Sequence, residues 1–205
     1  MEREATVFRD IPTGMLQRMH DLEELDATDR VDGTEFSRRL RQVPPSTGRL
    51  LALTAAMSPP GAWIELGASA GYSALWLSLA CRPCGRTLTT FEPDEGKLAL
   101  ARETFRLAGV QDVVTLVGGD ARDYLPDIHD VSFCFLDALK EIYLDCYELV
   151  VPNLAPGGLL VADNVTSHAQ DLAPFIERAL TDGRVDALVV PVDRGLLLAR
   201  RVGEA

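Results

Sequence analysis

The sequence predicts an α/β fold in which a doubly wound, mostly parallel sheet is covered by helices on both faces. From residue 61 onward, short runs of β-branched and aromatic residues alternate with amphipathic stretches of helical spacing. The first apolar run, 61–67, passes through a glycine-bracketed turn directly into a predicted helix. The last two predicted strands are joined only by Asp193-Arg194-Gly195, a connection short enough to make them antiparallel.

Each element follows from its pattern. The expected strands are 61–67, 86–92, 113–118, 131–136, 158–163, 185–192 and 195–201, and the expected helices are 71–81, 94–108, 120–126, 139–151 and 169–182. The first 60 residues show no strand pattern and predict a helical lid, with one helix beginning at Ser46 and Thr47. We expect a single domain over 1–205, with a helical cap at 1–60 and a cofactor- and metal-binding core at 61–205.

Charge and composition exclude several kinds of partner. The 205 residues carry 20 Lys and Arg against 31 Asp and Glu, a net charge of −11, which argues against nucleic acid as a substrate. No apolar run reaches the roughly 20 residues that span a bilayer, and the acidic opening does not resemble a signal peptide. We therefore expect a cytoplasmic protein without a membrane partner.

The four cysteines favour a structural interpretation. Cys81 and Cys84 form a CxxC pair, which is compatible with redox chemistry or with half of a zinc site. The pair follows a helix instead of opening one and lacks a second CxxC, so packing is the simpler interpretation.

The segment from Trp63 to Ser73 has the pattern of a cofactor-binding turn. Gly67 and Gly71 let the backbone turn sharply and approach a ligand, and the following helix begins with unpaired N–H groups. Glu65 adds a carboxylate at the turn, and Glu92 ends the next strand, where doubly wound folds place the carboxylate that binds a ribose diol. These features indicate an adenosine-bearing ligand.

Oxygen ligands follow two further strands. Asp137 comes after the fourth strand, and Asp163 and Asn164 come after the fifth, so all three are expected at one edge of the sheet. Two carboxylates and one amide suit Mg²⁺, Mn²⁺ or Ca²⁺ better than Zn²⁺, although Asp also caps helices and Asn is common in turns. Lys140 lies within reach of the same crevice, where a neighbouring cation would discourage its protonation and suit it to act as a general base.

Four motifs together resemble those of the catechol and caffeoyl-CoA O-methyltransferase family of S-adenosylmethionine-dependent enzymes. They are E-L-G-A-S-A-G-Y-S-A-L, G-D-A at 119–121, D-A-L-K-E-I-Y and P-G-G-L-L-V-A-D-N. The resemblance runs from Val43 to Val202 in the family's order and spacing and implies a Rossmann-like, seven-stranded fold. It also implies a homodimer, as in the relatives.

The resemblance implies a role for each matching residue. S-adenosylmethionine would be contacted by the cofactor-binding residues Val43, Glu65, Gly67, Ala68, Ser73, Glu92, Asp120, Ala121 and Asp137. A divalent cation, Mg²⁺ first and Mn²⁺ or Ca²⁺ as alternatives, would be bound by Asp137, Asp163 and Asn164. In the family's mechanism the ion chelates two vicinal oxygens of a small hydroxylated substrate, the residue matching Lys140 assists deprotonation, and the oxygen attacks the sulfonium methyl in line.

Departures from the family pattern lie mainly on the substrate side. Leu139 stands where plant members usually carry an aspartate, and Leu197 lies about where catechol-specific members place an acidic residue. Ser69 replaces a bulkier residue and Pro93 follows Glu92. The long substrate loop of the plant enzymes is absent before His168, a residue that would contact the substrate or cap a helix. The motifs therefore do not specify a catechol substrate.

Three alternatives remain open from the residues. Gly67 to Gly71 also satisfies GxSxG, the nucleophile elbow of hydrolases, with Ser69 as nucleophile and His168 following two aspartates, but no oxyanion loop precedes it. A nicotinamide dehydrogenase would need a third glycine and a different end to the sheet. A non-catalytic S-adenosylmethionine-binding protein would be expected to have lost its metal ligands, and all three donors and the lysine are present here.

Overall fold

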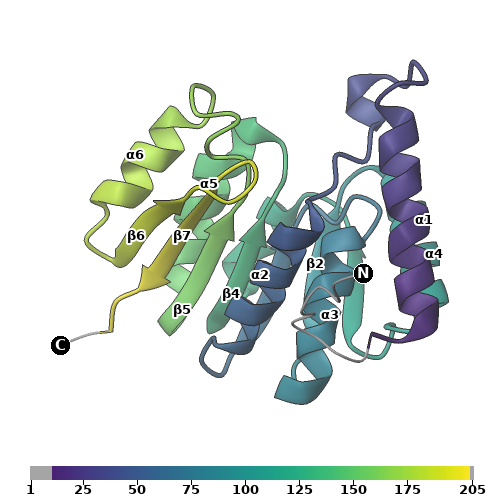
Figure 1. Cartoon of the computed structure of the whole chain (residues 1–205). Coiled ribbons are helices and arrows are strands. Elements are labelled where there is room, and N and C mark those ends of the chain that lie inside the picture. Colours follow the sequence, from purple (N-terminus) through teal and green to yellow (C-terminus); the bar gives the residue numbers. More distant parts are fainter. Residues whose placement is uncertain (1–10, 204–205) are drawn as a thin grey trace, which may run out of the picture.

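A computed structural model describes residues 11–203, which form a seven-stranded sheet of order β3-β2-β1-β4-β5-β7-β6 (Figure 1). Neighbours from β3 to β5 pair in parallel, whereas β7 pairs antiparallel with both β5 and β6. This order confirms the Rossmann-like fold predicted from the sequence, including its antiparallel ending. The strands are β1 (Ala62–Leu66), β2 (Leu88–Glu92), β3 (Val114–Gly118), β4 (Val131–Leu136), β5 (Leu154–Ala162), β6 (Val185–Val190) and β7 (Leu196–Arg201).

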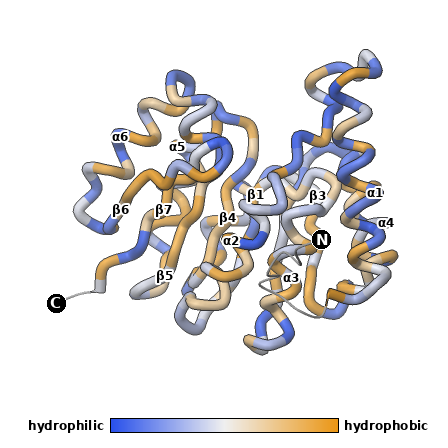
Figure 2. Tube along the Cα trace, in the orientation of Figure 1, coloured by the Kyte–Doolittle hydropathy of each residue, from blue (hydrophilic) through white to orange (hydrophobic). Residues whose placement is uncertain are grey.

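Helices cover both faces of the sheet, because the inner strands are apolar on both sides. In β1, Trp63 packs with the layer formed by α1 to α4, whereas Ile64 and Leu66 pack with the layer formed by α5 and α6. Figure 2 shows β5 and β7 as largely apolar stretches of the sheet. The helices are α1 (Thr13–Asp29), α2 (Pro45–Ala56), α3 (Tyr72–Cys84), α4 (Glu95–Ala108), α5 (Tyr143–Val150) and α6 (Ala173–Thr181).

Two predicted elements are wrong in kind or extent. The helix predicted at 120–126 is a pair of single 3₁₀ turns, Ala121–Asp123 and Leu125–Asp127, because the segment is too short for an α-helix and contains Pro126. Strand β5 begins at Leu154 instead of 158, because its Pro-Gly-Gly segment forms a bulge within the strand and not a turn before it.

Helix boundaries also differ from the predictions. The helix predicted at 139–151 opens with a 3₁₀ turn, Lys140–Ile142, and the helix predicted at 169–182 begins only at Ala173, next to Pro174. Ser46 and Thr47 do not cap α2, which starts at Pro45 after Pro44. Their hydroxyls donate to the Asp193 carboxylate instead, each at 2.6 Å.

Backbone hydrogen bonds extend beyond the carboxyl ends of the parallel strands and place the loops that follow. Asp137 N–H donates to Leu66 O at 3.0 Å, and Asp163 N–H donates to Leu136 O at 3.0 Å. On the other side of β1, Gly67 N–H donates to Phe91 O at 3.0 Å. The residues after β1, β4 and β5 are therefore held side by side by the sheet itself.

Among the helices of the described chain, none combines the length and the apolar character needed to cross a bilayer.

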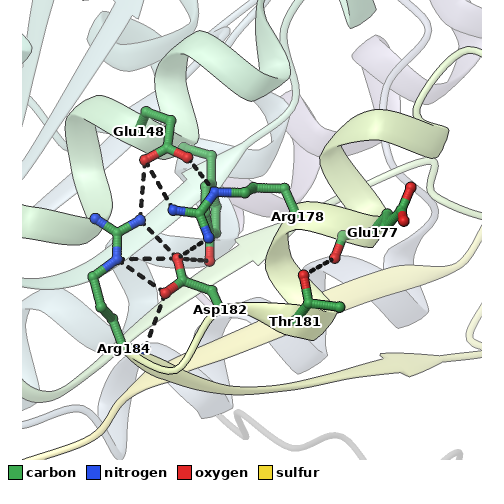
Figure 3. A network of polar contacts seen from close by, with 7 residues as sticks. Glu148, Glu177, Arg178, Thr181, Asp182 and Arg184 are labelled. Carbon is green, nitrogen blue, oxygen red and sulfur yellow. Dashed lines mark hydrogen bonds and ion pairs between the residues drawn. The ribbon is translucent and has the colours of Figure 1, made fainter.

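A polar network fastens α5, α6 and β6 at the far side of the sheet (Figure 3). The buried Asp182 carboxylate accepts from Arg184 at 2.6 Å and from the Tyr147 hydroxyl at 3.0 Å, and it pairs with Arg178 at 3.1 Å. Glu148 bridges both arginines from α5. The hydrogen bonds from Arg184 hold the pKa of Asp182 well below its usual range. Ionised Asp182 is therefore a structural anchor.

We expect Asp182→Asn to lower the free energy of unfolding by about 2 kcal/mol at neutral pH, because two guanidinium groups lose a buried carboxylate. The pKa of Asp182 is depressed in the folded state, so this stabilisation is present above about pH 4 and is lost as the pH falls further. Urea unfolding at several pH values measures it.

The matched control is Glu177→Gln, an exposed acid on α6 that keeps its backbone position but has no part in the Asp182 network. A stability difference between Asp182→Asn and wild type that stays constant from pH 7 to about pH 3 would contradict the role of the ionised carboxylate.

Candidate functional site

A cavity of about 420 Å³ opens at the carboxyl edge of the parallel strands. Its wall is formed by the loops after the five strands β1 to β5, the turn between β6 and β7, and the segment between α1 and α2. Of the residues predicted for the site, those lining it are Val43, Gly67, Ala68, Ser73, Glu92, Asp120, Ala121, Asp137, Lys140 and Asn164. Glu65 and Asp163 do not line it and are buried beside it.

Close approach of two loops explains the glycines of the turn after β1. Gly67 has φ 103° and its Cα faces the backbone after β4 so closely that a Cβ would lie 2.2 Å from Asp137 O. At Gly71, with φ 87°, a Cβ would lie 2.6 Å from the Phe105 ring. Only glycine fits both positions, as the cofactor-turn interpretation requires.

Glu92 presents a fixed carboxylate to the cavity. One oxygen accepts from Ser69 N–H at 2.7 Å and the other accepts from Asp94 N–H at 3.0 Å. Each carboxylate oxygen can accept more than one hydrogen bond, so the group can still receive a pair of hydroxyls from a ligand. This geometry suits the binding of a ribose diol.

Asp120 shapes the wall beside Glu92. Its Oδ1 accepts from Arg122 N–H at 2.9 Å, which caps the 3₁₀ turn and places Ala121 in the cavity wall. The Arg122 guanidinium binds the same carboxylate and also Asp145 on α5, and it lowers the pKa of Asp120. Asp120 is therefore engaged by its own neighbour and positions the turn.

Glu65 lies behind the turn and not at its mouth. It is fully buried, its Oε2 accepts from the Thr90 hydroxyl at 2.5 Å, and its Oε1 has no hydrogen-bond partner. Burial raises the pKa of Glu65 to about 7, against the opposing effect of hydrogen bonds from Ser73 and Thr90. Ionisation of Glu65 therefore lowers the free energy of unfolding.

Asp137 and Lys140 form the centre of the predicted metal and base site. Lys140 Nζ donates to Asp137 Oδ1 at 3.1 Å and to the Tyr143 hydroxyl at 2.7 Å. Asn164 Nδ2 also donates to Asp137 Oδ1, at 3.2 Å. Residues from two different strand ends therefore meet at one carboxylate, as the sequence predicted.

Asp163 is a buried carboxylate without hydrogen-bond partners. Both side-chain oxygens are buried and unpaired, and the residue is 1% exposed. Its desolvation, followed by the charge of Asp137, raises the pKa of Asp163, and the Asn164 backbone N–H, then the charges of Lys140 and Arg194, oppose the shift. An unpaired carboxylate beside a second one is an arrangement that a hard cation satisfies.

The donor set is small. Within residues 11–203, no cluster of three or more His, Cys, Asp or Glu side chains could hold a metal ion. The predicted cation site therefore depends on two carboxylates and one amide, with further positions left to water or substrate oxygens.

From the segment that closes one side of the cavity, sequence reasoning named only Val43 and missed Leu40 and Gln42. Leu40 N–H donates to Asp29 at 2.7 Å, and Gln42 N–H donates to Asp26 at 3.1 Å, so the end of α1 holds this segment. The Ser69 hydroxyl donates to Leu40 O at 3.1 Å from the cofactor turn. Two acids near the end of a helix were the only sequence signal, and their partners lie 11 and 16 residues away.

Tyr143 was also missed, although its spacing from Asp137 and Lys140 was visible. It is fully buried, its hydroxyl is 3.2 Å from Asp163 O, and it lies under the Lys140 ammonium. The remaining candidates from the sequence, His168 and the two cysteines, make fewer contacts with the other site residues. His168 lines the cavity and pairs with Asp171 at 3.1 Å, and Cys81 and Cys84 are unpaired thiols.

The fold and the cavity define a Rossmann-like methyltransferase, and comparisons with known proteins agree. A family model described as a methyltransferase domain matches residues 64–165. A catechol O-methyltransferase of Niastella koreensis is 34% identical over 128 residues, which span 60% of this chain and 58% of that enzyme.

A protein of Mycobacteroides abscessus classed with the O-methyltransferases is 32% identical over 174 residues, or 78% of this chain and 80% of the relative. The crystal structure of a Bacillus cereus O-methyltransferase in complex with SAH has the same fold, with a TM-score of 0.75, 23% identity and 90% coverage of each chain. The chain belongs to the catechol and caffeoyl-CoA type of S-adenosylmethionine-dependent O-methyltransferases, which confirms the resemblance predicted from its motifs.

We expect Glu65→Gln to be more stable than wild type at pH 8 by an amount on the order of 2 kcal/mol, and equal to it below about pH 4. The pKa of Glu65 rises from 4.5 to about 7 on folding, so the cost of ionising the buried group is absent below the first value and complete above the second. The Thr90 hydroxyl can still donate to the amide oxygen.

Thermal unfolding of both proteins and of the exposed control Glu141→Gln, across this pH range, measures the difference. A Glu65→Gln variant that is less stable than wild type at both ends of the range would show that the carboxylate is required for packing.

Proposed function

We propose that this enzyme methylates a hydroxyl of a small molecule that carries two vicinal oxygens, as catechol-like compounds do, and that it uses a divalent cation, Mg²⁺ first. Asp137, Asp163 and Asn164 would hold the cation. The observation that carries this proposal is the Asp163 carboxylate, buried without partners beside Asp137 at the cavity. Neighbouring buried carboxylates are stabilised when a cation takes up their charge.

When bound, the cation would orient two acceptor oxygens and stabilise the negative charge that develops on one of them. Lys140 Nζ lines the cavity beside Asp137 and would take the proton from the acceptor hydroxyl. A cation at Asp137 would compete with Lys140 for the Oδ1 oxygen, and the Tyr143 hydroxyl and Ala138 O would still hold the Nζ in position.

Residues along the cavity wall would contact successive parts of the cofactor. Glu92 would bind the ribose hydroxyls of S-adenosylmethionine, and the Asp120-Ala121 turn would lie against the adenine. Gly67, Ala68, Ser73 and Val43 would surround the methionine end, with Glu65 acting from behind the turn through Ser73. Asp137 adjoins both the cofactor turn and the cation site, and the acceptor would reach the sulfonium methyl from its side.

A serine hydrolase is not favoured. The Ser69 hydroxyl donates to Leu40 O and the imidazole of His168 pairs with Asp171, so within residues 11–203 no hydrogen bond links the two side chains. The left-handed φ of 47° at Ser69 serves the turn, whose amide binds Glu92. A binding protein without activity would not need the Asp137, Lys140 and Tyr143 arrangement.

The expected homodimer and cytoplasmic location stay predictions. Leu53 of α2 is 40% exposed and Met57, directly after this helix, is 77% exposed, which supports α2 as one surface for pairing.

We expect Asp137→Ala to reduce methyl transfer to a vicinal diphenol by at least about a hundredfold, because it removes a cation ligand and the partner of Lys140. SAH affinity should change far less, since the cofactor turn and Glu92 remain. Transfer assays with and without EDTA, together with calorimetry of SAH binding, measure both. The exposed Asp127→Ala is the matched control. Full-rate turnover by chelator-treated wild type would sink the metal-dependent mechanism.

We expect Ser69→Ala to retain methyl transfer within about tenfold of wild type, with a modest loss of SAH affinity because one hydrogen bond to the Leu40 segment disappears. Initial rates and SAH titration provide the readouts. Complete loss of turnover with unchanged SAH binding would revive Ser69 as a reacting group.

A further inference from the structure

Arg194 occupies the turn between β6 and β7, and the fold fixes its backbone from two sides. Its carbonyl accepts from Thr166 N–H and Ser167 N–H, each at 3.0 Å, directly after the predicted cation ligand Asn164. The adjacent Asp193 carboxylate is held by Ser46 and Thr47 of α2, each at 2.6 Å. The half-buried Arg194 side chain lines the cavity at this end.

The Arg194 guanidinium has no hydrogen-bond or ion-pair partner among the described residues, whereas the acids of the cavity wall are engaged elsewhere. Glu92 accepts two backbone amides, Asp120 binds Arg122, and Asp137 pairs with Lys140. Among the other cations of the wall, Arg30 pairs with Asp26, and the Arg41 guanidinium lies over the Phe36 ring on the segment between α1 and α2. Arg194 therefore offers a cationic fork, carried on a fixed backbone, to whatever enters the cavity beside Asn164.

We propose that Arg194 is a specificity-determining residue that selects methyl acceptors bearing a carboxylate, which it binds while the vicinal oxygens lie at Asp137, Asp163 and Asn164. The inference rests on the proposed function, because it concerns the same acceptor site. Arginine matches a carboxylate with two parallel hydrogen bonds, and a half-buried position strengthens the pairing relative to open solvent.

The rest of the acceptor end indicates that the carboxylate is carried on a ring. Leu139 and Ile142 line the cavity on either side of Lys140, and Phe36 lines it from the segment between α1 and α2. Leu139 is 58% exposed and Phe36 is 61% exposed, so both present apolar surface that a flat ligand can cover. An aromatic acid with two adjacent hydroxyls meets the apolar wall, the oxygen ligands and the guanidinium together.

The cofactor also carries a carboxylate, but the position of Arg194 favours binding of the acceptor carboxylate over binding of the cofactor carboxylate. Arg194 adjoins Thr166 and Ser167 after β5, whereas the predicted methionine contacts lie on the turn after β1 and at Val43. Removal of the guanidinium should therefore leave SAH binding unchanged and weaken only the acceptor.

The test compares wild type with Arg194→Gln, Arg194→Glu and the control Arg200→Gln, an exposed arginine on β7. The acceptors are protocatechuate, which is a vicinal dihydroxybenzoate, its neutral amide, and the cationic dihydroxybenzylamine. Calorimetry measures binding of SAH and then of each acceptor to the SAH complex with Mg²⁺, and transfer assays give kcat/KM.

We expect wild type to prefer protocatechuate. Arg194→Gln should lose about ten- to a hundredfold in kcat/KM and in affinity for protocatechuate, and should use the other two acceptors as wild type does. Arg194→Glu should prefer the benzylamine, while Arg200→Gln matches wild type. Equal use of all three acceptors by wild type and Arg194→Gln would overturn the carboxylate assignment and leave the proposed function intact. A fall in SAH affinity in Arg194→Gln would assign the guanidinium to the cofactor and also overturn it. If wild type binds SAH but, with S-adenosylmethionine as the donor, methylates none of the three acceptors, the proposed function is contradicted, and so is this inference.

Discussion

The site depends on the contact between the turn after β1 and the backbone after β4. Gly67 lies so close to the Asp137 carbonyl that a side chain at 67 would separate them, and the Asp137 amide is itself bonded to the end of β1. This contact sets the cofactor turn and the cation ligand within one rigid frame. Because the β5 end is bonded to the β4 end in the same way, Asp163 and Asn164 join that frame without a dedicated connection.

Much of this arrangement could be predicted from the sequence, because it follows from strand ends. Alternating apolar patterns place β1, β2, β4 and β5 in a parallel sheet, and parallel strands deliver their following residues to a common edge. The grouping of Asp137 with Asn164 needed no knowledge of side-chain packing. The same reasoning failed at β5, which is expected from the sequence to begin at 158 but begins at Leu154 and runs through the Pro-Gly-Gly segment with a bulge.

The residues that the sequence did not indicate are those whose partners are distant or hidden. Leu40 and Gln42 are held through backbone amides by Asp26 and Asp29, a contact that leaves no pattern in the bound segment. Glu65 was expected at the mouth of the turn, but alternation along β1 directs it into the sheet toward Thr90. The hydroxyls of Ser46 and Thr47 bind Asp193 and do not cap the helix. The partners lie about 150 residues apart in the sequence, so local capping rules do not predict this contact.

In the β6–β7 turn the backbone has a structural role, whereas the Arg194 side chain is available to a ligand. Its main chain is clamped between α2 and the segment after β5, and Gly195 fits against Thr166 with no space for a Cβ. The neighbouring guanidinium, by contrast, makes no hydrogen bond or ion pair among residues 11–203, and its charge acts on Asp163 only from a distance. Diversification of acceptor preference can therefore proceed by exchanging a single side chain on an immobile platform, without redesign of the surrounding scaffold.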